Sequence, residues 1–155
     1  MNQNGRVIWI TGLSGAGKTT LAEALRPLLP DPVIWYDGDV LGQAIAPIRE
    51  GLSPEEVYSR RERLRRSRVC SGLYLLAANQ GLTVICSTIT MFHEIQDWNR
   101  QNLPNYFEIF LDMPEIVRKS RDFKKIYRQS TSPVIGSQIP AELPRRPDLH
   151  FTIPP

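Results

Sequence analysis

The residues best suited to chemistry lie between positions 12 and 19, where the sequence reads Gly-Leu-Ser-Gly-Ala-Gly-Lys-Thr. This is the G-x-x-x-x-G-K-[ST] spacing of a phosphate-binding loop. The glycines let successive backbone N–H groups point inward, and the helix that follows adds its unpaired N-terminal N–H groups. Lys18 can reach the β- and γ-phosphates of a nucleoside triphosphate, and the Thr19 hydroxyl can ligate Mg²⁺. We expect the nucleotide to contact Gly12, Leu13, Ser14, Gly15, Ala16, Gly17, Lys18, Thr19 and Thr20.

Two carboxylates follow the second apolar run of the chain. Val33–Tyr36 is succeeded directly by Asp37, Gly38 and Asp39. Because functional groups of open α/β sheets gather at the carboxyl ends of the strands, both carboxylates are expected in the cleft that holds the phosphate-binding loop. A carboxylate there can orient an acceptor hydroxyl and take its proton. The alternative is an Asp-Gly turn that only caps the chain.

Two stretches are rich in basic residues. Six arginines lie between positions 60 and 68, and a second basic stretch runs from 118 to 128. Arginines can hold an anionic substrate through paired hydrogen bonds, and basic residues on a lid can neutralise charge on a transferred phosphoryl group. In a helix, Arg61, Arg65 and Arg68 share one face. Most of these arginines are expected on a solvated face, with one or two in the site.

The elements that position these residues alternate along the chain. Apolar runs predict strands at 7–11, 33–36, 83–87, 106–111 and 149–153, and the segments 17–29, 53–79 and 93–103 and a stretch after Pro114 are predicted helices. Residues 41–53 are expected to form a short helix plus a loop. This order predicts an α/β protein of the P-loop NTPase fold, with a parallel five-stranded sheet and helices on both faces.

Size and composition limit the classes of protein to consider. The chain has 155 residues, 41% of them hydrophobic, and a net charge of +3, which suits one domain over 1–155 and an anionic small-molecule partner. The N-K-x-D segment of GTPases is missing, and the third predicted strand does not end in the acidic residue of a Walker B strand. Neither a leader nor a membrane span is recognisable. We therefore expect a small-metabolite kinase in the cytoplasm, without nucleic-acid or membrane partners.

Five segments, taken in order, carry a more specific resemblance: residues 12–22, 37–39, 81–90, 121–127 and 140–149. They are similar to the G-L-S-G-[AS]-G-K-[ST]-T-[LI]-A, L-D-G-D, G-L-x-V-I-x-[SA]-F-I-S, R-D-P-K-G-L-Y and P-Y-E-x-P-x-x-P-D-L segments of adenylylsulfate (APS) kinases. That family transfers the γ-phosphate of MgATP to the ribose 3′-hydroxyl of APS. The resemblance therefore implies ATP and Mg²⁺ as cofactors and a nucleotide acceptor.

The resemblance also implies roles for individual residues. Asp37 is the implied general base, assisted by Lys18 and by Lys124 on a lid over about residues 118–140. Asp39 is implied near the substrate or a water bound to Mg²⁺, which Thr19 ligates. The remaining implied positions are Arg121 near the nucleotide base, Ile89 and Thr90 in the substrate pocket, and Arg65 or Arg68 as the substrate arginine.

The departures from the family pattern lie mainly on the acceptor side. Gly42 stands where the family has a substrate-binding arginine, and Leu52 stands where it has an aromatic residue. Residues 91–100 resemble a subgroup linked to surface-polysaccharide modification, one member of which phosphorylates cytidine diphosphoramidate. That acceptor is the leading alternative to APS, and a non-catalytic ATP sensor is the second. A homodimer is left open.

Overall fold

One parallel sheet forms the centre of the protein. The computed structural model describes residues 5–30, 32–121 and 133–152. Its strands are β1 (Arg6–Gly12), β2 (Val33–Asp37), β3 (Thr83–Thr88), β4 (Tyr106–Asp112) and β5 (Leu149–Thr152). They lie in the order β2-β3-β1-β4-β5, and every pair is parallel. The predicted five-stranded parallel sheet is therefore confirmed.

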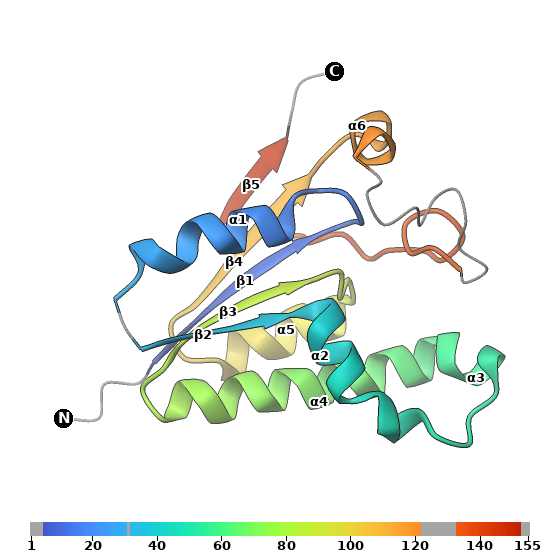
Figure 1. Cartoon of the computed structure of the whole chain (residues 1–155), viewed down its shortest axis with the longest axis horizontal. Coiled ribbons are helices and arrows are strands. Elements are labelled where there is room, and N and C mark those ends of the chain that lie inside the picture. Colours follow the sequence, from blue (N-terminus) through green and yellow to red (C-terminus); the bar gives the residue numbers. More distant parts are fainter. Residues whose placement is uncertain (1–4, 31, 122–132, 153–155) are drawn as a thin grey trace.

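Helices cover both faces of this sheet, as predicted (Figure 1). One face carries α1 (Lys18–Leu25), and the other carries α4 (Arg60–Asn79) and α5 (His93–Asn102). The shorter elements are η1 (Arg26–Leu28), α2 (Gly38–Ala44), η2 (Ala46–Arg49), α3 (Pro54–Tyr58) and α6 (Glu115–Ser120). Within the described residues, no helix combines the length and apolar character needed to cross a membrane.

The core has two parts because successive side chains of a strand point to opposite faces. On the α4 and α5 face, Trp9 packs edge-on against Tyr74 with ring centroids 5.9 Å apart. On the α1 face, Ile8, Ile10 and Ala22 belong to the second buried cluster. Burial of both faces explains why β1 is a continuous apolar run and not an alternating one.

Three predicted helix boundaries were wrong, and each error has a local cause. The α-helix after the phosphate-binding loop stops at Leu25, because the 3-10 turn that follows contains a proline, which lacks an N–H group. The helix predicted over 53–79 is two helices, since Ser59 is extended at ψ 149° and its hydroxyl caps α4 by accepting from Glu62 N. The first helix after β2 starts at Gly38 because Asp37 caps it.

Candidate active site

A cleft of about 750 Å³ opens at the carboxyl ends of β1, β2 and β3. Its volume is in the range of pockets that hold small organic ligands. Most of the residues predicted from the sequence lie along its wall. They are Ser14, Gly15, Gly17, Lys18, Thr19, Thr20, Asp37, Asp39, Ile89, Thr90 and Arg121.

The phosphate-binding loop has the backbone geometry that its glycines predict. Gly15 and Gly17 have φ angles of 80° and 95°, in the left-handed region that favours glycine. A Cβ atom on Gly15 would also lie 2.6 Å from the carbonyl oxygen of Arg118. Lys18 Nζ donates to the carbonyl oxygen of Leu13 at 3.0 Å, which places the ammonium group across the loop. The arrangement forms an anion cradle at the N-terminus of α1.

Three predicted loop residues do not line the cleft. Gly12 lies against β4, where a Cβ atom would be 2.7 Å from the carbonyl oxygen of Leu111. Ala16 is buried in the core on the α1 face. The Leu13 side chain lies under Gly136, whose added Cβ would meet it at 2.6 Å. These three residues pack against the rest of the protein, while Ser14, Gly15 and Gly17 of the same loop face the cleft.

Both carboxylate oxygens of Asp37 accept hydrogen bonds in the cleft. Its Oδ1 atom accepts from the backbone N–H groups of Asp39 and Val40 at 3.0 and 3.3 Å. Its Oδ2 atom accepts from the hydroxyls of Thr19 and Ser87, both at 3.2 Å. Asp37 therefore caps α2 through one carboxylate oxygen, as the capping alternative predicted, while the other oxygen accepts from Thr19 of the phosphate-binding loop, so the cap does not exclude a role in the cleft.

The segment after β3 lines the cleft with hydroxyl groups. The hydroxyl oxygens of Thr88 and Thr90 lie 3.0 Å apart, and the Thr88 hydroxyl also accepts from Thr90 N at 3.2 Å. Ile89 lies between them on the cleft wall. These hydroxyls can both donate and accept hydrogen bonds, which suits the polar edge of a nucleotide.

The structure does not bring Arg65 and Arg68 to the cleft. Arg65 donates to Glu62 Oε2 at 2.8 Å and to the carbonyl oxygen of Ile48 at 3.1 Å. The Arg68 guanidinium stacks over the Trp98 ring, with 4.3 Å from its central carbon to the ring centroid. Neither side chain lines the cleft, and their contacts fit a structural role on α4.

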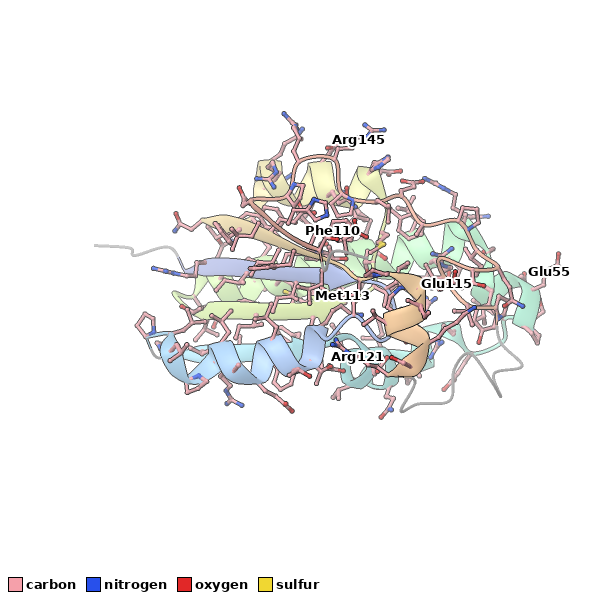
Figure 2. All side chains as sticks on the ribbon, turned by 90° about the horizontal axis from the view of Figure 1, so that it is seen from above. Glu55, Phe110, Met113, Glu115, Arg121 and Arg145 are labelled. Carbon is pink, nitrogen blue, oxygen red and sulfur yellow. The ribbon has the colours of Figure 1, made fainter. Side chains whose placement is uncertain are left out.

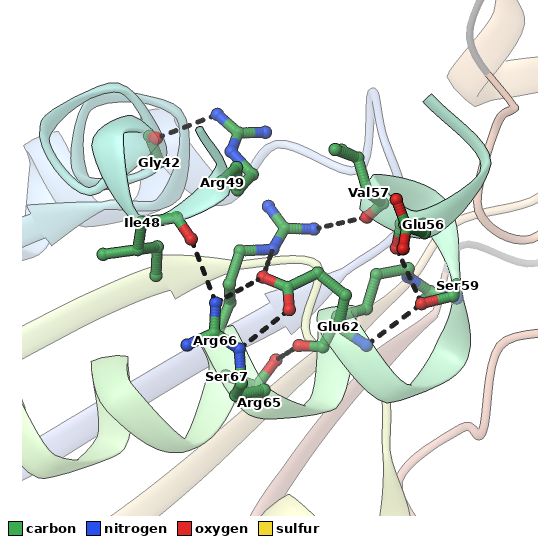
Figure 3. Close-up of polar contacts among 11 residues, drawn as sticks. Gly42, Ile48, Arg49, Glu56, Val57, Ser59, Glu62, Arg65, Arg66 and Ser67 are labelled. Carbon is green, nitrogen blue, oxygen red and sulfur yellow. Dashed lines mark hydrogen bonds and ion pairs between the residues drawn. The ribbon is translucent and has the colours of Figure 1, made fainter. Parts of the chain in front are cut away.

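Arg63 and Arg66 line the cleft in their place. The Arg63 side chain is buried and its guanidinium lies 4.9 Å from the centroid of the Phe92 ring. Arg66 donates to the carbonyl oxygen of Val57 at 3.4 Å and lies 3.9 Å from Glu62 (Figure 3). The buried Nε atom of Arg66 makes no hydrogen bond within the described part of the chain.

Burial and neighbouring positive charges lower the pKa of both arginines, so an anion beside them would be favourable. Burial is the first cause that lowers the pKa of Arg63, and the charges of Arg66 and Arg60 lower it further. The pKa of Arg66 is lowered by burial and then by the charge of Arg49. An anion placed between these cations would offset the repulsion, and guanidinium groups bind phosphate-like anions through paired hydrogen bonds.

The rotation of α4 about its own axis decides which of its residues face the cleft, and this is the signal that could have identified these arginines. On this helix Tyr74 is 2% exposed and Leu76 is 62% exposed, so Tyr74 marks the side that faces the protein interior. Counting back from Tyr74 in steps of three and four residues passes through Cys70, Ser67 and Arg66 to Arg63. All of these residues line the cleft.

The end of α6 and the segment after residue 132 also contribute to the cleft wall. Arg121 lies at the end of α6 beside the start of α1, whereas Arg145 lies over α5 on the other side of the sheet (Figure 2). The predicted lid over about 118–140 includes the end of α6 and residues 133–140, of which Ile135 lines the cleft. Lys124 lies outside the described residues.

Comparison with known proteins identifies the family. The family model described as adenylylsulphate kinase matches residues 4–152. The chain belongs to the adenylylsulphate kinase family. It is 38% identical over 154 residues to an adenylyl-sulfate kinase of Deinococcus deserti, covering 95% of this chain and 81% of that protein. It is also 33% identical over 148 residues to the cytidine diphosphoramidate kinase of Campylobacter jejuni, covering 92% of this chain and 81% of that protein.

A solved structure agrees with this assignment. The Mycobacterium tuberculosis APS kinase in complex with AMPPNP and APS matches with a TM-score of 0.79 and 25% identity, covering 96% of this chain and 88% of that one. The resemblance predicted from the sequence motifs is therefore confirmed over nearly the whole chain.

Proposed function

We propose that this chain transfers the γ-phosphate of ATP to the ribose 3′-hydroxyl of APS. The observation that carries the proposal is the composition of the cleft, where one wall is the phosphate-binding loop and another holds the buried Arg63 and the half-buried Arg66. The loop would hold the phosphates of ATP, and the two arginines would hold the phosphosulfate of the acceptor. Asp37 lies between these walls.

Asp37 is suited to orient the acceptor hydroxyl and to take its proton. Hydrogen bonds to both carboxylate oxygens fix its direction, and its Oδ2 atom faces the phosphate-binding loop through Thr19. Such positioning supplies much of the rate enhancement in phosphoryl transfer. Lys18 would stabilise the negative charge of the transferred group.

The residues around Thr19 also fit Mg²⁺. The Thr19 hydroxyl and the Asp37 carboxylate are hard oxygen donors 3.2 Å apart, the ligand type that Mg²⁺ prefers beside phosphates. Thr19 would bind the ion, with Asp37 on its water shell. Bound there, Mg²⁺ supplies neutralising charge to the β- and γ-phosphates.

A second acceptor, cytidine diphosphoramidate, is supported by the C. jejuni relative and by the open wall at Gly42. Gly42 lines the cleft, and a Cβ atom built on it meets no atom within 4 Å. This chain therefore leaves space where the family pattern places an arginine. A diphosphoramidate has the same anionic character as a phosphosulfate, so Arg63 and Arg66 would serve either acceptor.

The deciding experiment is steady-state turnover of ATP with Mg²⁺ and each acceptor in turn. Turnover on the order of 1–100 s⁻¹ with APS is the expected result. Turnover with cytidine diphosphoramidate but not with APS would change the assigned acceptor. The proposed roles of the ATP-side residues and Asp37 would stay the same. Tight ATP binding without turnover on either acceptor would overturn the proposal and favour an ATP sensor.

A further inference from the structure

A single side chain joins the segment after residue 132 to both helices beside the acceptor wall. Glu142 Oε2 accepts from His93 N at 2.7 Å, and Glu142 Oε1 accepts from Arg60 Nη2 at 3.0 Å. The Glu142 backbone makes two further bonds, donating to the carbonyl oxygen of Met91 and accepting from Gln96 Nε2, both at 3.1 Å. Glu142 therefore contacts α4 and α5 at once, although it lies in neither.

The bond to His93 completes the start of α5. The residue before this helix is Phe92, which supplies no side-chain cap. The Glu142 carboxylate takes that place from a distant part of the chain, since it accepts one of the N–H groups that a helix leaves unpaired at its N-terminus. The positive end of the helix dipole also favours a negative charge there. Glu142 thus fixes the backbone on the C-terminal side of Phe92.

The bond to Arg60 acts on the same aromatic ring. The guanidinium carbon of Arg60 lies 5.3 Å from the centroid of the Phe92 ring, and that of Arg63 lies 4.9 Å from it. Phe92 and Arg63 line the cleft. Glu142 therefore acts on Phe92 in two ways. It fixes the backbone beside Phe92, and it binds Arg60, whose guanidinium stacks on the Phe92 ring. Arg63 packs on the same ring.

We infer that Glu142 is a positioning residue for the acceptor, acting through Phe92 and Arg60 to hold Arg63 in the cleft wall. This inference rests on the proposed function of the cleft. The Glu142 charge also counteracts the neighbouring cations that lower the pKa of Arg63. Glu142 itself is not in the cleft wall, so its effect should fall on acceptor binding and leave the ATP side unchanged.

The test is Glu142→Gln, with Glu94→Gln as its matched control. Glu94 lies in the first turn of the same helix and is exposed, so this control removes the same charge from the same helix end. We expect Glu142→Gln to raise the KM for the acceptor roughly three- to tenfold, with the KM for ATP unchanged. The control should change neither value.

Arg60→Ala gives an independent variant, because it leaves the bond between Glu142 and His93 in place. We expect it to raise the acceptor KM as well, and the double variant should show less than the product of the two effects. An unchanged acceptor KM in folded Glu142→Gln would overturn the inference. Equal changes in both KM values, or a fall in kcat alone, would also overturn it, since these indicate a general structural role.

The proposed function and the positioning role of Glu142 can be disproved separately. If wild-type protein turns over neither APS nor cytidine diphosphoramidate, the proposed function fails. If the wild-type protein is active and the acceptor KM of Glu142→Gln equals the wild-type value, only the positioning role is disproved.

Discussion

The two walls of the cleft are built in different ways. The proposed ATP side comes from one local motif, since its cleft residues all lie between positions 14 and 20, and backbone N–H groups would make most of the contacts with phosphate there. The acceptor side gathers side chains from α2, from α4 and from the segment after β3. The first wall is defined by a local motif, whereas the second exists only once distant helices have packed. Substitutions should therefore act locally on the first wall and through neighbours on the second.

Asp37→Asn should have the largest effect, since Asp37 contacts both walls. Asparagine also caps helices well, so α2 should survive while the negative charge is lost. We expect kcat to fall by about 10²–10⁴-fold, the usual contribution of a general base. Steady-state kinetics would measure it, with Asp97→Asn on the exposed side of α5 as the control. Near wild-type kcat in Asp37→Asn would exclude this residue from the chemistry.

Lys18→Ala should come next and should affect one wall only. The ammonium group that crosses the loop to Leu13 is lost, and we expect kcat to fall by about 10²–10³-fold, as for other removed charge stabilisers. The Kd of the acceptor should stay at its wild-type value. Arg6→Ala is the control, because Arg6 is an exposed cation at the amino end of β1 and does not line the cleft. A large loss of acceptor affinity in Lys18→Ala would show that the walls are not independent.

The two walls also differ in how well they could be predicted from the sequence. The sheet and the phosphate-binding loop were predictable because apolar runs and a contiguous motif determine them. Asp37 was predictable because it follows directly from a strand. Arg63 and Arg66 were missed because their selection depends on the rotation of α4, which Tyr74 sets by packing on Trp9. The break at Ser59 was missed because a serine inside a helical pattern caps a helix only when the chain turns there.

Glu62→Gln should have the smallest effect, on stability and not on chemistry. The hydrogen bond from Arg65 is the largest cause that lowers the pKa of Glu62. An acid with a lowered folded-state pKa stabilises the fold above its unfolded value, about 4.3, and this contribution is lost as pH falls through the folded-state pKa. At pH 7 the variant should therefore lose on the order of 1 kcal/mol, as Arg65 is half exposed.

Urea denaturation at several pH values measures that difference. The gap between wild type and Glu62→Gln should narrow as the pH falls from 7 toward 4 and below. A gap that is constant or widens toward low pH would show that the carboxylate charge of Glu62 is not what stabilises α4.

The most direct test of the acceptor wall compares two pairs of arginines on the same helix. Arg63→Ala with Arg66→Ala removes the two arginines of α4 that line the cleft, while Arg65→Ala with Arg68→Ala removes two arginines of the same helix that do not. Acceptor affinity would be measured for each double variant by calorimetry, with ATP affinity as the internal reference. The account predicts a loss of about tenfold or more for the first pair, whose bonds to the anion are charge-assisted, and little change for the second. Equal losses in the two pairs, or a larger loss in the second, would contradict it.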